Sequence, residues 1–141
     1  MVATLKISSE LKDRIVAETM RQPSVEVCGL LLGRGLHVAE AVPCRNVAAD
    51  PARRFEIDPR ALLAAHRRAR IGGPPVIGCY HSHPSGTAAP SPRDAADAAA
   101  DGSIWIVVAG GTLTAWRAIE GGALHGRFET LAIEPACRVA R

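Results

Sequence analysis

Short apolar runs alternate along the chain with amphipathic stretches, and each pattern predicts a type of element. Apolar runs of about four to eight residues bounded by Gly, Pro or polar residues are typical of strands. Apolar residues at helical spacing behind a Ser or Asp cap indicate helices. The expected strands are residues 3–7, 25–33, 36–42, 55–57, 76–83, 104–108 and 112–116, with one or two more within 124–134. The expected helices are residues 8–22, 59–71 and 91–101.

These elements follow one another in the order β-α-β-β-β-α-β-α-β-β-β. Interspersed strands and helices of this kind predict an α+β (mixed α/β) fold in which helices pack on a mixed sheet. With 141 residues, the chain is expected to form one domain over residues 1–141. Its 48% apolar and 22% charged residues are typical of a globular protein with a core.

The helical patterns also predict which side chains face the core. In the first helix the expected buried residues are Leu11, Ile15 and either Thr19 or Met20. In the second, residues at helical spacing are Leu62 or Leu63, His66, Ala69 and Arg70. His66 is therefore interpreted as a packed or half-exposed helix residue, whereas His37 and His125 are expected to face solvent.

Candidate chemistry is concentrated in residues 78–94, which read G-C-Y-H-S-H-P-S-G-T-A-A-P-S-P-R-D. His81 and His83 lie two residues apart near the end of a predicted strand. Side chains at that spacing share one face of a strand. Both imidazoles are therefore expected to point the same way.

A carboxylate is expected to join them from the next helix. Ser91 and Pro92 are typical of the N-cap and N1 positions, so Asp94 falls at N3. Taken alone, Ser91 and Asp94 read as an ordinary capped helix start. Together with the two histidines they favour a three-ligand zinc site, because catalytic zinc typically takes three protein ligands and one water. Zinc lowers the pKa of that water to about 7.

The four cysteines allow an alternative to the zinc chemistry. Cys28, Cys44, Cys79 and Cys137 form no C-x-x-C pair, so reduced, buried thiols are expected. Cys79 lies two residues before His81 on the same strand face. A cysteine nucleophile or a competing thiolate ligand at Cys79 is therefore the alternative chemistry.

The spacing H-x-H, seven residues, S-x-x-D resembles the signature of the JAMM (MPN+) metalloproteases. That signature also includes an upstream E-x-x-G-L-L-L-G context, and residues 26–33 read E-V-C-G-L-L-L-G. The five positions of the signature match without departure: Glu26, His81, His83, Ser91 and Asp94. The resemblance implies a curved mixed sheet flanked by helices, with a cytidine-deaminase-like architecture.

The resemblance also implies roles for these residues. His81, His83 and Asp94 would bind one Zn²⁺ per chain. The fold would bring Glu26 from another strand to act as the general base, and the Ser91 hydroxyl would stabilise the oxyanion. Without the downstream motif, Glu26 would read only as an exposed residue at a strand end.

The implied activity is that of a zinc-dependent peptidase or isopeptidase. Enzymes of this family cleave the bond after the C-terminal tail of ubiquitin or ubiquitin-like proteins. The short chain and the seven-residue loop after His83 indicate the minimal prokaryotic type, whose implied substrates are sulfur-carrier proteins with a Gly-Gly tail. The alternatives are a non-catalytic MPN scaffold and a DNA-repair-associated JAMM relative, although the chain has no room for the latter's N-terminal DNA-binding region.

The charge and hydropathy of the chain limit the classes of binding partner that we expect. A net charge of +3 does not favour nucleic acid, and no run of residues approaches a membrane span. Residues 1–13 lack the apolar core of a signal peptide, so a cytoplasmic location is expected. Seven arginines within residues 45–70 form either a solvated helix face or a docking surface for an acidic protein substrate. A homodimer remains open.

Overall fold

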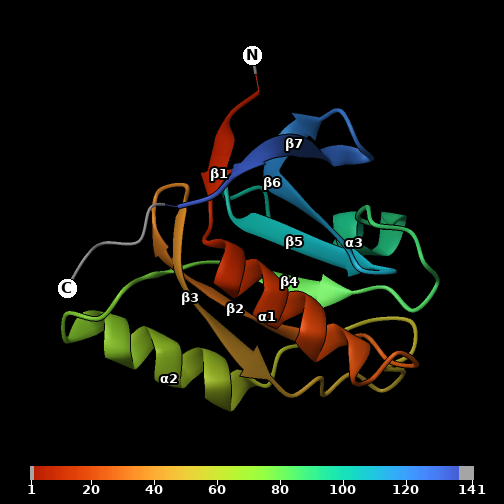
Figure 1. The fold of residues 1–141 in the computed structure, drawn as a ribbon, viewed down its shortest axis with the longest axis horizontal. Helices are drawn as coiled ribbons and strands as arrows, with labels where there is room; N and C mark the ends of the chain where they lie inside the picture. The colour runs from red at the N-terminus through yellow and green to blue at the C-terminus, as the bar shows by residue number, and fades with distance from the viewer. Residues whose placement is uncertain (1, 137–141) are drawn as a thin grey trace.

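The computed structural model describes residues 2–136. Within them lie three helices and seven strands (Figure 1). The strands are β1 (Thr4–Lys6), β2 (Cys28–Arg34), β3 (His37–Cys44), β4 (Val76–Ser82), β5 (Ile104–Ala109), β6 (Thr112–Gly122) and β7 (Gly126–Glu134). The helices are α1 (Ser9–Met20), α2 (Pro59–Arg70) and α3 (Pro92–Asp97).

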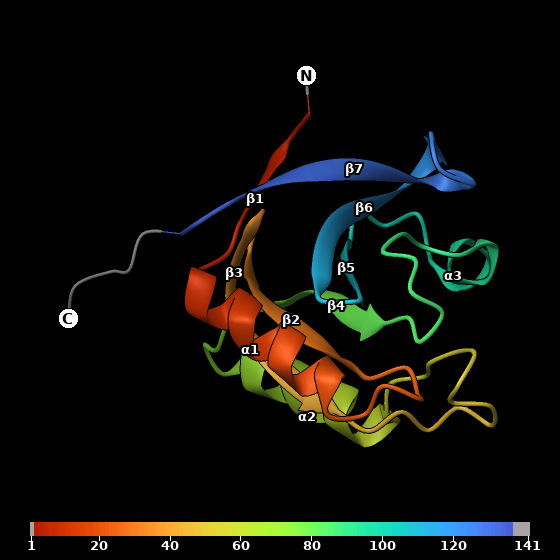
Figure 2. The ribbon, with the colours of Figure 1, turned by 45° about the vertical axis from the view of Figure 1, so that its right-hand side comes forward.

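The strands form one mixed, closed sheet. Their order is β1-β3-β2-β4-β5-β6-β7, and β1 closes the barrel by pairing in parallel with both β3 and β7 (Figure 2). The β4–β5 pair is also parallel, whereas the remaining neighbours are antiparallel. The expectation of a curved mixed sheet with helices packed on it is confirmed.

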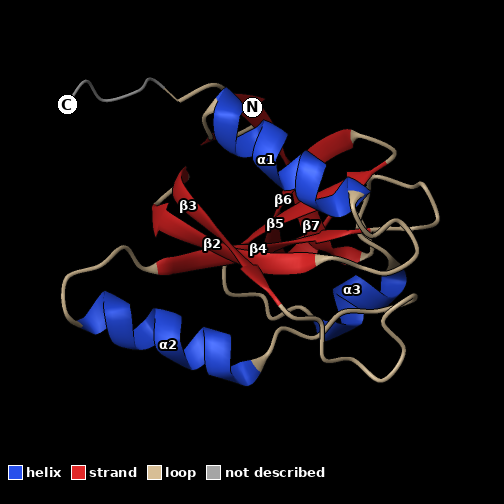
Figure 3. Ribbon diagram, turned by 60° about the horizontal axis from the view of Figure 1, so that its bottom comes forward, coloured by secondary structure: helices blue, strands red, loops and turns tan. Residues whose placement is uncertain are grey.

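Helices α1 and α2 lie on opposite sides of the β2–β3–β4 region (Figure 3). This follows from the run of buried leucines in β2, because successive strand side chains point to opposite faces. Leu31 joins the core under α1, together with Leu11 and Ile15. Leu30 and Leu32 form a separate cluster with Ala65 of α2. A strand covered on both faces is apolar throughout.

The helix starts and the buried face of α1 agree with the sequence, but the inner face of α2 differs. Ser8 and Asp58 cap α1 and α2 as expected. In α1, Leu11, Ile15 and Thr19 are buried as expected, whereas Met20 is 67% exposed. In α2 the expected stripe was wrong: Ala65 is the buried residue, and Leu62, Leu63 and His66 are exposed. Ala65 packs against Leu30 and Leu32 of β2, and its larger neighbours in the helix face solvent.

Three further boundaries differ from the expectation. Strand β2 begins at Cys28, because the Val27 N–H donates to the side-chain hydroxyl of Ser82, the last residue of β4, instead of to a backbone carbonyl. The expected strand 55–57 is reduced to one bridge between Ile57 and Asn46. Helix α3 ends at Asp97, since Ala98 leaves the helix to pack against Trp105 and Phe128. Packing here outweighs the helix propensity of the alanine-rich run.

Strand β6 is longer than expected and continues to Gly122, whereas β7 is a single strand within the expected range 124–134. His37 and His125 are exposed, as expected. Within residues 2–136, none of the helices combines the length and the apolar character needed to cross a membrane.

Candidate metal centre

Four buried side chains from three parts of the chain meet at the end of β4. One ligand atom from each of Glu26, His81, His83 and Asp94 lies within 4.8 Å of the others. In the part of the chain that the structure describes, this is the one such group of His, Cys, Asp and Glu side chains. The resemblance implied that Glu26 would join the downstream motif, and the fold does bring it there.

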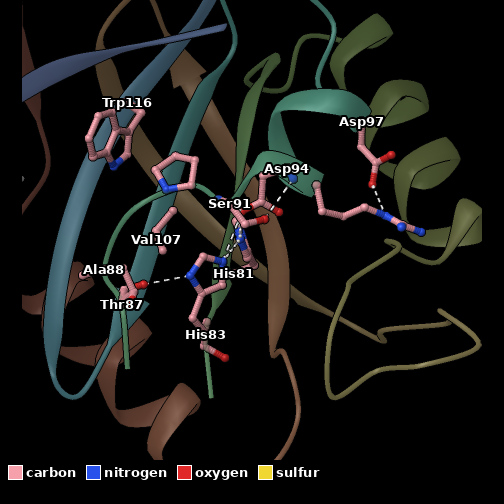
Figure 4. A network of polar contacts seen from close by, with 12 residues as sticks. His81, His83, Thr87, Ala88, Ser91, Asp94, Asp97, Val107 and Trp116 are labelled. Atoms are coloured by element: carbon pink, nitrogen blue, oxygen red, sulfur yellow. Dashed lines mark hydrogen bonds and ion pairs between the residues drawn. The ribbon is translucent and has the colours of Figure 1, made fainter. Parts of the chain in front are cut away.

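Strand β4 and its exit position the two histidines. His81 lies between Cys28 of β2 and Val107 of β5 in the sheet register and is fully buried. His83 follows the last residue of β4, and its backbone N–H donates to the Val108 carbonyl at 2.9 Å. The two Nε2 atoms are 3.0 Å apart, so both rings face the same point (Figure 4).

The start of α3 orients the carboxylate. Ser91 is the N-cap and Asp94 is N3, as the sequence predicted, and the two form a capping box. The Ser91 Oγ accepts from the Asp94 N–H at 3.0 Å, and the Asp94 Oδ2 accepts from the Ser91 N–H at 2.9 Å. These reciprocal bonds fix Oδ2 beside the histidines.

The arrangement suits a small divalent cation. The Asp94 Oδ2 lies 3.0 Å from His81 Nε2 and 3.1 Å from His83 Nε2. In a tetrahedral zinc site with bonds of about 2.0–2.1 Å, ligand atoms lie about 3.3 Å apart. The His83 Nδ1 is 2.8 Å from the Thr87 carbonyl oxygen, which can only accept, so Nδ1 carries the proton. With a proton on Nδ1, Nε2 is the His83 nitrogen that faces Asp94 and that could act as a metal ligand in the neutral ring.

His81 is oriented differently, by an aromatic neighbour that the sequence did not indicate. Its Nδ1 is buried without a hydrogen-bond partner. Phe55 stacks on the imidazole at a centroid distance of 4.3 Å and an interplanar angle of 19°. Trp105 contacts the ring edge-on at 5.7 Å. An aromatic residue in a loop 26 residues before His81 carries no local signal of this contact.

Glu26 reaches the group from the segment just before β2. Its N–H donates to the Pro51 carbonyl at 2.7 Å, and its carbonyl accepts from the Asn46 side chain at 2.8 Å. The side chain is 5% exposed, and its Oε1 has no hydrogen-bond partner. Glu26 lines a cleft of about 580 Å³ that α1 and the residues following β3 also border. An open approach to this side of the group is thus present.

Burial and mutual contacts shift the ionisation of these groups. Burial raises the pKa of Glu26 to about 7, although the nearby His83 opposes the shift. Burial by itself would also raise the pKa of Asp94. The hydrogen bonds from His81 and His83 outweigh this effect and hold the pKa of Asp94 well below its usual range. Burial lowers the pKa of His81. The group therefore favours a neutral His81 and a charged Asp94, which is the ligand form of each.

Cys79 does not join the cluster. It packs with Trp105 and Phe128, and burial raises the pKa of its thiol far above the ordinary value. A thiolate nucleophile or ligand at Cys79 is accordingly disfavoured. Cys28, Cys44 and Cys79 are free thiols, and Cys137 lies outside the described residues.

The model of the family described as prokaryotic homologs of the JAB domain matches residues 8–119, a span that contains all five signature positions. The chain belongs to the prokaryotic JAB family. Among JAB relatives, a desampylase of Haloferax volcanii is 30% identical over 109 residues, which cover 73% of this chain and 78% of that protein. A probable TtuB-protein conjugate cleaving protease of Thermus thermophilus is 36% identical over 94 residues, covering 67% and 63% of the two chains.

The JAB fold is also seen in solved structures. A JAB1/MPN domain protein of Archaeoglobus fulgidus superposes with a TM-score of 0.60 over 92% of this chain and 98% of that chain. At 20% identity, this likeness concerns the fold alone. It agrees with the mixed sheet and helices described above.

Proposed function

We propose that the protein is a zinc-dependent isopeptidase that cleaves the bond after the C-terminal Gly-Gly tail of a ubiquitin-like or sulfur-carrier protein. The observation that carries this proposal is the convergence of two imidazoles and a carboxylate, with a second buried carboxylate beside them. One relative is named as a protease that cleaves protein conjugates, which supports a protein substrate of this class.

Zinc would be held by His81, His83 and Asp94. The donor set fits, because two neutral nitrogens and one carboxylate oxygen suit a catalytic zinc site with an open position. Bound zinc supplies a Lewis acid that makes water nucleophilic near neutral pH and polarises a carbonyl group.

Glu26 would serve as the general base. It takes a proton from the attacking water and returns it to the leaving amine. Its position supports this role, because the carboxylate lies within the group while Oε1 keeps no internal partner. A pKa near 7 in the isolated site also suits a group that must both accept and release a proton.

Ser91 would stabilise the oxyanion. Its oxygen accepts from the Asp94 N–H, so its own proton stays available for the substrate carbonyl oxygen. Removing one such donor typically lowers kcat by about 100- to 1,000-fold. We expect that loss for Ser91→Ala with zinc content unchanged, since the backbone N–H of residue 91 still donates to the Asp94 Oδ2 and holds it beside both histidines. Steady-state kinetics with metal analysis of the same sample measures both, and a full kcat in this variant contradicts the role.

Metal content is the first test. Mass spectrometry after zinc add-back is expected to find one zinc per wild-type chain and a marked loss in Asp94→Ala. An Asp97→Ala variant, one helical turn further along α3, is the matched control and should keep its zinc. If the wild type binds no zinc, the hydrolase mechanism is wrong and a non-catalytic scaffold becomes the better reading.

Cleavage is the second test. The substrates are a carrier protein whose Gly-Gly tail is joined to a lysine side chain of a reporter peptide, and the same carrier extended by a cysteine. Wild type should release the intact Gly-Gly tail, and Glu26→Gln should bind zinc but not cleave. Zinc-loaded wild type that cleaves neither substrate contradicts this proposal.

A further inference from the structure

We propose that Asn46 is a positioning residue that holds Glu26 at the metal centre through the Glu26 backbone. This inference rests on the proposed function of Glu26 as the base. Asn46 itself touches none of the four clustered side chains through a hydrogen bond; its contacts are with main-chain groups.

The Asn46 side chain uses its full hydrogen-bonding capacity. Its Nδ2 donates to the Glu26 carbonyl at 2.8 Å and to the Arg54 carbonyl at 3.0 Å. Its Oδ1 accepts from the N–H groups of Ala48 at 3.0 Å and Glu56 at 3.1 Å. An amide has two donors and an acceptor oxygen with two lone pairs, so only Asn or the longer Gln has the groups for this set of contacts.

Glu26 depends on such contacts because it lies outside the sheet. Strand β2 begins two residues later, so no ladder bond fixes Glu26. Its carbonyl is held by Asn46, and its N–H by Pro51 in the loop that Asn46 ties together. Since Oε1 has no partner, the protein orients the carboxylate through its backbone.

The same amide also bears on His81. Arg54 and Glu56, which both bond to Asn46, flank Phe55, and Phe55 stacks on the His81 ring. One side chain thus connects the segment before β2 with the loop that packs on a clustered histidine. A misplacement of about 1 Å in such a support can lower a rate by about 100-fold.

The test begins with Asn46→Ala. We expect kcat to fall by about 10- to 100-fold with KM changed less than about three-fold and zinc content unchanged, because the loss concerns the orientation of the base. Asp58→Ala is the matched control. Its side chain accepts from the Arg60 N–H at the far end of the same loop, and it makes no contact with Glu26. This control should keep the wild-type kcat.

A further variant separates positioning from general loop stability. Asn46→Asp keeps both accepting contacts but cannot donate to the Glu26 carbonyl, so it should remain as slow as Asn46→Ala. A wild-type kcat in Asn46→Asp overturns the inference.

An additional readout is independent of activity. Amide hydrogen exchange at Glu26, whose N–H donates to Pro51, should accelerate at least about ten-fold in Asn46→Ala, whereas Leu31 in the core should not change. Unchanged exchange at Glu26 overturns the inference even if the protein proves inactive. An inactive wild type with faster Glu26 exchange in the variant contradicts the proposed function alone.

Discussion

Glu26 is a buried carboxyl group without an internal partner at Oε1, and this arrangement is unfavourable for stability. Burying a charge is costly unless it is paired, so the folded metal-free protein favours the protonated acid. A base near a metal centre needs the same features, since a carboxylate satisfied by internal hydrogen bonds is less able to accept a proton. Under the role proposed for Glu26, the site would exchange some stability for reactivity.

The pH dependence of stability tests this trade-off in the metal-free protein. The pKa of Glu26 rises from 4.5 to about 7 on folding, so its ionisation opposes folding as pH increases between these values. Below pH 4.5 wild type and Glu26→Gln should be equally stable. Above pH 7 the variant should be more stable by about 1–2 kcal/mol, less than the full shift of about 3 kcal/mol because the adjoining cleft admits water.

Urea denaturation of both proteins with chelator present, at pH 4.5 and pH 8, measures the difference. Glu129→Gln is a suitable control, because that carboxylate is paired with Arg117 on the sheet surface and its loss should not stabilise the protein at pH 8. A Glu26→Gln variant no more stable than wild type at pH 8 would mean that the carboxylate is ionised at little cost.

The residues of the candidate site differ in how well the sequence alone predicted that they belong to it. His81, His83, Ser91 and Asp94 follow from local rules, because strand alternation and helix capping act over a few residues. Glu26 is separated from them by more than fifty residues and was indicated only by the resemblance. Asn46 and Phe55 were not indicated, because their contacts with main chain and ring depend on how the loop 46–57 folds back.

At the scale of elements, the buried strands were predictable and the loop that folds beside the candidate metal centre was not. β2, β4 and β5 are apolar on both faces and give strong signals. The segment 55–57 reads as a strand, yet Asn46 takes two of the backbone groups that a strand would use. When a side chain takes the place of a neighbouring strand as hydrogen-bond partner, the hydrophobic pattern of the sequence does not show it.

Close packing between β2 and β4 explains the glycine of the upstream signature, Gly29, without any catalytic role. A Cβ at Gly29 would lie 2.2 Å from the Tyr80 ring, so only glycine fits there. Tyr80 in turn donates to Glu18 of α1 at 2.5 Å and ties that helix to the sheet. Gly29, three residues after Glu26, thus allows β2 to pack closely on β4, the strand that contains His81. This strand pair joins the upstream and downstream parts of the signature.

At the scale of the whole molecule, positive charge gathers along α2 and the loop before it. Arg45, Arg53, Arg60, Arg67 and Arg70 are exposed, and Arg68 pairs with Glu40 at 2.9 Å. A solvated surface and a docking surface for an acidic substrate make different predictions. Attraction between surfaces is screened by salt, whereas a solvated face that touches no substrate is indifferent to it.

If this surface docks the substrate, the double reversal Arg60→Glu/Arg67→Glu should raise KM at least about five-fold at low salt while kcat stays constant, because rim charges act on association. The effect should shrink at high salt, where the Debye length falls to about 3 Å at 1 M. Lys6→Glu, a reversal on β1 outside this surface, is compared with Arg60→Glu alone, which changes the net charge by the same amount. A wild-type KM that does not change with salt, or an equal rise in Lys6→Glu, favours the solvated face and moves the docking question to the cleft beside Glu26.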